Sequence, residues 1–488
     1  MSKCVLGTDR DDPRKEMPCK RCVGQAGALY AGVRSNIKSQ TSHVEWFKYQ
    51  RDERLANAIE KLSVPELMTF EWQLKSEPVV ANPEGVKQSP RGSGIASSQK
   101  TLLAMTIPLG ALCLPGLRWI LRIHHLEDDE KTRYLLREYI LSAWNVAGRF
   151  SDFLDRTQPG AVVVFNGQFF PEATARFIAQ QRGIRVITHE VGLQPASAYF
   201  TEGEATAYPI HIPDEFELND GQNAKLDAYL AKRFQGDFTM AGIKFWADMK
   251  GLDGSFLQQA SRFKQIVPIF TNVVFDTSQP HANTVFEDMF QWLDLALEAI
   301  KSHPETLFVI RAHPDELRVR KSSRETVQGW VDRHEVRKEP NVVFVSPNAT
   351  LSSYELIRKS KFVMIYKSPI GLEASIMGAA VLCAGRARFT QYPTVFFPQS
   401  VEAYRQELET FLNGDAIEPP AIFKRNARRF LYYQLFRTSL PFGDFLEPSV
   451  RTTQTRLKTF PLSKLLQSDA VKAILEGILK GGDFLLSE

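Results

Sequence analysis

The stretch FVMIYKSPIGLEASIMGAAVLCAG, residues 362–385, predicts a strand, a tight turn, a helix and a second strand in immediate succession. Phe362–Tyr366 is a short apolar run with β-branched residues, typical of a strand buried on both faces. Ser368 is a favoured N-cap residue, and Pro369 occupies the favoured first helical position. Ala380–Ala384 begins the next strand. This alternation predicts an α/β fold with a parallel sheet.

The turn between the first strand and the helix carries the side chains of an anion site. Lys367 and the Ser368 hydroxyl are hydrogen-bond donors, and a helix N-terminus adds free N–H groups and partial positive charge. Gly371 leaves the backbone open to a ligand, and the Glu373 carboxylate can accept hydrogen bonds from ribose hydroxyls. We therefore expect a nucleotide phosphate at this edge of the sheet. An ordinary βαβ turn is the alternative, and it stays open because short motifs are weakly specific.

Composition sets the class of protein. The chain has 488 residues, of which 43% are hydrophobic and 24% charged, as in soluble globular proteins of two to four domains. A net charge of +4 argues against a dedicated nucleic-acid binder, but it leaves open anionic substrates and a peripheral membrane contact. Five cysteines and a polar N-terminus without a secretory signal predict a cytoplasmic protein.

Two segments of the sequence need to be tested, one as a membrane span and the other as a metal site. Thr101–Ile120 is apolar up to Arg118, but two prolines and two glycines interrupt it, so we expect a buried or interfacial segment and not a span. Cys4, Cys19 and Cys22 include a CxxC pair, yet no second pair follows, and a zinc site normally needs four ligands. We therefore predict no metal.

Strand and helix patterns alternate in both halves of the chain. In the N-terminal half, strands at Ala161–Phe165 and Ile184–Thr188 flank a helix at Pro171–Gln181, which makes a βαβ unit. His189 and Glu190 follow the second strand, at the edge where ligands bind in parallel sheets. The C-terminal half repeats the alternation from Gln265 onward, and residues 202–264 between them lack convincing strands. We expect four parts: 1–215, a first α/β domain; 216–264, a helical linker; 265–422, a nucleotide domain; and 423–488, a helical tail.

Several motifs of the C-terminal half resemble those of bacterial capsule polysaccharide biosynthesis proteins, which are glycosyltransferases of the GT-B type. They are Thr271-Asn272-Val273, Arg311-Ala312-His313-Pro314, Ser353-Tyr354-Glu355-Leu356, Ser368-Pro369-Ile370-Gly371-Leu372-Glu373, Gly378-Ala379-Ala380-Val381 and Gly385. The resemblance covers about Gln265–Tyr404 well and Asn166–Gly192 more loosely. It implies two Rossmann-like, doubly wound domains that face each other across a cleft. The usual first strand and Gly-rich loop are missing, so we expect an N-terminal domain that is incomplete or starts differently.

The resemblance also implies roles for named residues. The C-terminal domain would hold a nucleotide-sugar donor as co-substrate, with no further cofactor, and the N-terminal domain a polysaccharide or lipid-linked glycan acceptor. The donor-binding residues would be Asn272, Arg311, His313, Lys367, Ser368, Gly371 and Glu373. Glu190 or His189 would supply the base that deprotonates the acceptor hydroxyl, and His313 would approach the donor phosphates or the sugar.

The predicted function is therefore metal-independent transfer of a sugar to a growing capsular polysaccharide or glycolipid. The helix N-terminus, Lys367 and Arg311 would neutralise the leaving group. Two alternatives remain. One is a nucleotide-sugar epimerase or a polyol-phosphate transferase, and the other is a non-catalytic scaffold of a capsule assembly complex.

Overall fold

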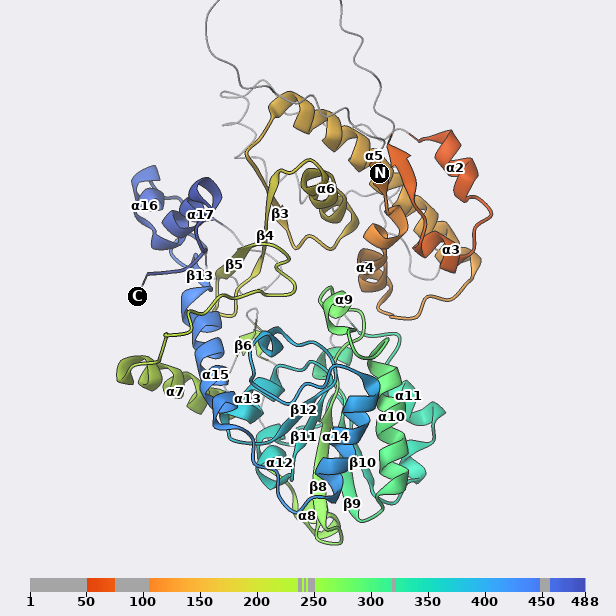
Figure 1. Cartoon of the computed structure of the whole chain (residues 1–488), viewed down its shortest axis with the longest axis vertical. Coiled ribbons are helices and arrows are strands. Elements are labelled where there is room, and N and C mark those ends of the chain that lie inside the picture. The colour runs from red at the N-terminus through yellow and green to blue at the C-terminus, as the bar shows by residue number, and fades with distance from the viewer. Residues whose placement is uncertain are drawn as a thin grey trace, which may run out of the picture.

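The computed structural model describes residues 51–74, 105–235, 239–240, 243–244, 251–317, 322–447 and 457–487. Within them the chain forms two α/β domains, one above the other in Figure 1. The three N-terminal cysteines and the Asn82–Lys100 segment, rich in Gly, Ser and Pro, lie outside the described residues.

The N-terminal domain is built on a four-stranded sheet with the order β13-β5-β4-β3. β3 (Ala161–Phe165) and β4 (Arg185–Val191) run parallel, with Phe165 opposite His189. β5 (Ser197–Glu202) then pairs antiparallel with β4, and β13 (Leu440–Pro441) pairs antiparallel with β5. The predicted βαβ unit is thus present, but antiparallel strands extend the sheet beyond it.

Helices cover this sheet and form most of the domain core. The long helix α5 (Glu130–Thr157) packs on α4 (Leu109–Leu121) and α6 (Phe170–Gln181), as the apolar spacing along α5 predicts. The smaller elements are α2 (Glu53–Ile59), α3 (Val64–Met68), β1 (Trp72–Leu74) and β2 (Met105–Ile107).

The apolar segment Thr101–Ile120 is used inside this domain, as expected. Its described part forms β2 and most of α4, and Leu109, Cys113 and Leu117 are fully buried in the core. Among the described residues no helix combines the length and the apolar character needed to cross a bilayer.

The C-terminal domain has a fully parallel five-stranded sheet with the order β10-β9-β8-β11-β12. Its strands are β8 (Gln265–Phe270), β9 (Thr306–Arg311), β10 (Val342–Val345), β11 (Val363–Ile365) and β12 (Val381–Cys383). The chain moves outward from β8 to β10 on one side and then returns to place β11 on the other side. This doubly wound order confirms the predicted fold class.

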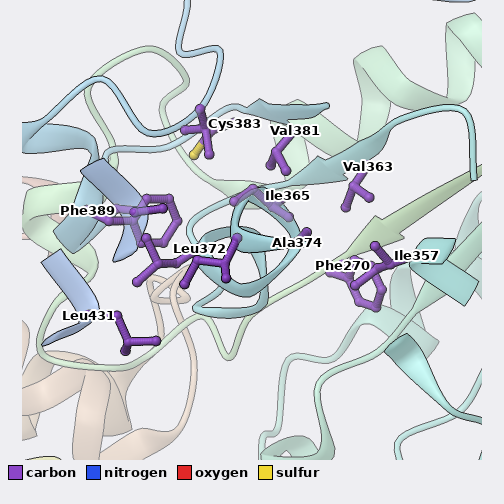
Figure 2. Packing of buried hydrophobic residues seen from close by; sticks show 14 of the residues in the cluster. Phe270, Ile357, Val363, Ile365, Leu372, Ala374, Val381, Cys383, Phe389 and Leu431 are labelled. Carbon is purple, nitrogen blue, oxygen red and sulfur yellow. The ribbon is translucent and has the colours of Figure 1, made fainter. Parts of the chain in front are cut away.

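Helices lie on both faces of the parallel sheet and divide its core in two. One face carries α10 (Met289–Ser302), α11 (Val327–Arg333) and α14 (Val401–Asn413), and the other carries α12 (Ser353–Lys359), α13 (Ile370–Ile376) and α15 (Ala421–Tyr432). Figure 2 shows the second face, where Ile365, Leu372 and Phe389 pack together. The short elements are α9 (Gln279–Ala282) and the single turns Pro314–Leu317, Val336–Lys338 and Arg388–Gln391.

The segments outside the two domains connect them. α7 (Asp220–Phe234), β6 (Thr239–Met240), β7 (Ile243–Lys244) and α8 (Gly254–Ala260) lead into the C-terminal domain. α15 and the turn Tyr433–Arg437 lead back out of it, and β13, α16 (Leu462–Gln467) and α17 (Asp469–Lys480) lie against the N-terminal domain (Figure 1). Phe430 and Tyr433 are buried, and Arg429 is buried too and donates to Pro213 O.

Candidate functional site

The candidate site begins where the strand order of the parallel sheet reverses, between β8 and β11. Asn272 follows β8 and Lys367 follows β11, and the Lys367 backbone N–H donates to Asn272 Oδ1 at 3.1 Å. The crevice outside the carboxyl ends of two such strands is the usual ligand site of doubly wound sheets. Two residues that the sequence analysis placed in the site are therefore joined directly at its centre.

A chain of polar contacts extends from Lys367 into the loop after β8. The Lys367 ammonium donates to the Ser278 hydroxyl, which in turn donates to Asp276. Burial lowers the pKa of Lys367 to about 8, although Asp276 acts to raise it. Burial works to raise the pKa of Asp276, but Lys367, Ser278 and Arg388 together hold it below its ordinary value. Asp276 is thus a carboxylate at neutral pH, close to the cations Lys367 and Arg388.

The residues after β9 lie beside this chain of contacts. The His313 ring accepts the Asp315 backbone N–H at Nδ1, at 3.1 Å, so we assign the proton of the neutral ring to Nε2. Burial lowers the pKa of His313, while Asp276 acts to raise it and Lys367 to lower it. Arg311 is almost fully buried, and burial lowers its pKa to about 10. One of its N–H groups donates to Ala349 O at 3.4 Å, so Arg311 is bound to the loop after β10.

Glu190 of the N-terminal domain lies close to the same loop of the C-terminal domain. Asn166, which follows β3, donates both to the Glu190 carboxylate and, at 3.2 Å, to the Thr277 hydroxyl of the C-terminal domain. Burial raises the pKa of Glu190, while Asn166, the Val191 backbone N–H and the Arg388 charge act to lower it. We call Asn166, Glu190, Asp276, Thr277, Ser278, Lys367 and Arg388 the interdomain cluster. A partly buried carboxyl group with a raised pKa in such a cluster is suited to proton transfer.

His189 is separated from Glu190 because successive side chains of a strand point to opposite faces. Its ring stacks on Phe200, with 4.9 Å between centroids, and also contacts Phe165. Burial lowers its pKa. Phe200 in turn packs on Phe484 of the C-terminal tail, so His189 belongs to the sheet face that the tail covers. Of the two candidate bases, the structure places Glu190 alone in the interdomain cluster.

Three predicted ligands, one just before α13 and two on it, have different surroundings. The Ser368 side chain is buried, and its hydroxyl makes no hydrogen bond to the described part of the protein. Gly371 packs against β11, since a Cβ there would lie 2.2 Å from Ile365 Cδ1. Glu373 is buried and bonds to Arg233 and Tyr354. Ser368 thus directly follows Lys367 of the site, while Gly371 and Glu373 face the packed core.

Asn166, Asp276 and Arg388 are functional candidates that the sequence analysis did not name. Asn166 has a φ of 58°, in the left-handed region that asparagine tolerates, and it directly follows β3. That Asn-Gly turn was a usable signal. Asp276 lies in the loop after β8, which carries no motif that would mark it. Arg388 lies on a short turn after β12, where no local pattern distinguishes it from a surface arginine.

Taken together, the fold and the site define a two-domain α/β protein with polar side chains gathered where its domains meet. Residues 249–393 match the family model described as "Capsule polysaccharide biosynthesis protein". The resemblance predicted from the motifs is therefore confirmed over this segment, which includes β8, β11 and α13. The curated protein FixF of Sinorhizobium fredii is 30% identical over 228 residues, which are 46% of this chain and 48% of FixF. The chain thus spans about half the length of this relative.

Solved structures give more distant matches. The KpsC β-Kdo 2,4-transferase of Thermosulfurimonas dismutans aligns with 58% of this chain and 81% of its own, at 11% identity and a TM-score of 0.36. A protein described as a UDP-N-acetylglucosamine 2-epimerase of Listeria monocytogenes aligns with 60% of this chain and 77% of its own, at 14% identity and a TM-score of 0.27.

Proposed function

We propose that the protein is a glycosyltransferase of capsule or related surface-glycan synthesis that uses a nucleotide-sugar donor. The family match over residues 249–393 supports the biological setting. The single observation that carries the reaction type is the position of Glu190, a carboxyl group of one domain held at the ligand edge of the other through Asn166 and Thr277.

In this proposal the donor diphosphate lies at the reversal of strand order, between Asn272 and Lys367. Lys367, Arg388 and the Ser368 hydroxyl contribute positive charge and a free donor to the phosphates. His313 offers Nε2–H to a phosphate or sugar oxygen. Protein cations near the leaving group stabilise the charge that develops in the transition state, so the proposed transfer needs no metal at the donor.

Glu190 acts as the general base in the proposed reaction. It accepts the proton of an acceptor hydroxyl while the oxygen attacks the anomeric carbon, and the nucleotide leaves with the electron pair of the broken bond. Burial raises the pKa of Glu190, which makes the carboxylate a better proton acceptor near neutral pH. Asn166 is a positioning residue, because it orients Glu190 and does not touch the donor.

The test begins with thermal shifts of the full chain against CMP, UDP, GDP and their sugars. A ligand that binds only the folded state raises the melting temperature. We expect one nucleotide class to do so, and Lys367→Met to remove the shift while the control Lys338→Met, at an exposed lysine, keeps it. Absence of a shift with every nucleotide would contradict the proposal and favour the scaffold.

Turnover separates the remaining alternatives. Glu190→Gln is expected to keep donor binding and to lose transfer by about 10²–10⁴-fold, the usual contribution of a general base. The matched control is Glu202→Gln on the neighbouring strand β5, where the glutamate pairs with Arg185 in solvent. Retained transfer in Glu190→Gln would remove Glu190 as the base. Interconversion of the donor sugar without an acceptor would identify an epimerase.

We also propose that the C-terminal helices contact a membrane surface, where a lipid-linked acceptor would be found. Four leucines of α16 and α17 are exposed, Leu462, Leu466, Leu475 and Leu479. Lysines 464, 472 and 480 lie on the same two helices, which suits anionic lipid headgroups. Cosedimentation with anionic phospholipid vesicles tests this, and the Leu475→Glu, Leu479→Glu double variant should stay in the supernatant. Equal sedimentation of both proteins would contradict the membrane contact.

A further inference from the structure

A second cluster of side chains joins the two domains away from the interdomain cluster. His124 and His125 follow α4 in the N-terminal domain, while Asp288 and Glu325 lie before α10 and α11 of the C-terminal domain. The loop that carries the histidines is fixed to the other domain by a backbone hydrogen bond of 3.0 Å from Arg324 N–H to Arg122 O. The histidines and the carboxylates therefore meet only when the domains are in contact.

Three of these side chains have the spacing of a metal site. One ligand atom from each of His124, His125 and Asp288 lies within 4.8 Å of the other two. His125 Nε2 and Asp288 Oδ2 are 3.0 Å apart, which is close to the separation of neighbouring ligands around one ion.

Hydrogen bonds to neighbouring groups orient two of the three candidate ligands, as such bonds commonly do around metal sites. Glu325 Oε1 lies 2.6 Å from His125 Nδ1, which holds the proton there and points Nε2 toward Asp288. Asp288 Oδ1 accepts the backbone N–H groups of Phe290 and Gln291 at the start of α10, so Oδ2 is the oxygen left for an ion. The second Glu325 oxygen accepts the His124 backbone N–H at 2.8 Å.

His124 is the independent observation that points to a ligand. Its side chain belongs to a residue that is only 6% exposed, and its ring nitrogens make no hydrogen bond to the described part of the protein. Its ring contacts the His125 ring edge to face, with 5.0 Å between centroids. An ion bridge between His125 and the two carboxylates would account for His125, Asp288 and Glu325, but it would not involve the His124 ring, which lies beside them.

We propose that His124, His125 and Asp288 bind one divalent transition-metal ion of the zinc class across the domain junction. Two imidazoles and one carboxylate suit Zn²⁺ or Co²⁺ and not Mg²⁺ or Ca²⁺, which prefer oxygen ligands alone. The fourth position is open to water on the side of His125, whose side chain is 56% exposed. The ion replaces the proton of His125 Nε2, and it ties the N-terminal domain to the start of α10.

The charges around the proposed site are balanced for such an ion. Asp288 and Glu325 supply two negative charges, and Arg118, which donates to His124 O at 2.8 Å, supplies one positive charge. Arg118 lowers the affinity for a cation, and the two carboxylates offset it. This proposal does not depend on the glycosyltransferase reaction, because its evidence and its test involve no donor, acceptor or turnover.

The experiment is metal titration of the full chain after chelation and dialysis. We expect one equivalent of Co²⁺ to give the visible absorption of a four- or five-coordinate site, and Zn²⁺ to displace it and raise the melting temperature. Absorption typical of cobalt–thiolate bonds would instead assign the metal to cysteines and overturn the proposal, as would the absence of any bound cobalt.

Variants locate the ion. His124→Ala and Asp288→Asn are each expected to weaken Co²⁺ binding at least tenfold, and the asparagine keeps an oxygen to cap α10. Glu325→Gln is expected to weaken binding about 10–100-fold, as loss of an outer carboxylate usually does. The control is His334→Ala, a histidine 3.7 Å from Asp294 without a third ligand, which should bind as the unmodified chain does. Unchanged binding in His124→Ala would overturn the proposal, because His124 has no part in an ion bridge.

Discussion

Replacement of Glu373 by alanine is expected to destabilise the protein rather than to remove a nucleotide ligand. The Glu373 side chain is 5% exposed and pairs with Arg233, which is 14% exposed, and it also accepts the Tyr354 hydroxyl. Arg233 lies on α7 and Glu373 on α13, so the pair fastens the segment between the domains to the parallel sheet.

The expected magnitude follows from what the substitution leaves behind. Removal of one partner from a buried ion pair usually costs about 3–5 kcal/mol, because the other charge stays buried without compensation. Here Arg233 keeps a hydrogen bond of 3.3 Å to the Tyr229 hydroxyl and some access to solvent, which favours the lower end. Loss of the Tyr354 hydrogen bond adds about 1 kcal/mol. We therefore expect the free energy of unfolding to fall by about 3–4 kcal/mol.

Urea denaturation followed by tryptophan fluorescence measures this change. The matched control is Glu298→Ala, which breaks a solvent-exposed pair with Arg405 and should cost no more than about 1 kcal/mol. The double variant Glu373→Leu, Arg233→Met removes both charges and should recover most of the loss. The reasoning is refuted if Glu373→Ala unfolds at the same urea concentration as the unmodified chain while its nucleotide affinity is lost.

Three further predictions concern buried groups. Burial raises the pKa of Glu316 from 4.5 to about 7, so the folded state holds a proton that the unfolded chain releases, and the free energy of unfolding falls as pH rises between these values. Urea denaturation should therefore show Glu316→Gln to be more stable than the unmodified chain by up to about 3 kcal/mol at pH 8, and to differ little from it at pH 4. Gly371→Ala should cost about 1–3 kcal/mol by overpacking, with part of the loss recovered in an Ile365→Val background; equal stability would show that the α13–β11 contact can relax. Burial raises the pKa of the Cys113 and Cys383 thiols, so peptide mapping after iodoacetamide should find both unmodified until denaturant is added, and labelling in the folded state would contradict their burial.

The parallel strands could be predicted because their signal is local. The apolar run Ala161–Phe165 forms β3 with the predicted bounds, and β8 begins at Gln265, where the C-terminal alternation was expected to start. β5 (Ser197–Glu202) was missed because its polar and aromatic residues have no alternation that marks a strand. The two-residue strand β13 was missed for a different reason, since it pairs with a partner more than 240 positions earlier.

The candidate site was predictable where residues follow a parallel strand, and not where a helix decides which way they point. Asn272, His313 and Lys367 follow strands of the parallel sheet, which brings them to one edge, and Glu190 lies near the end of β4 in the other domain. Glu373 is one turn into α13, where the predicted ribose contact depended on the rotation of a seven-residue helix. Its partner Arg233 lies 140 positions away, so no pattern around Glu373 could reveal the ion pair.

The pairing of β13 with β5 has a consequence for how the protein is made. Ile187 of β4 is fully buried against Leu440, Ala470, Ala473 and Phe484, all of which leave the ribosome long after β4 does. Until then the nascent N-terminal sheet has an open edge at β5 and an uncovered apolar face, which are features that invite aggregation. Chains that stop before β13 would retain both, so residues far downstream of β5 protect the N-terminal sheet from misassembly.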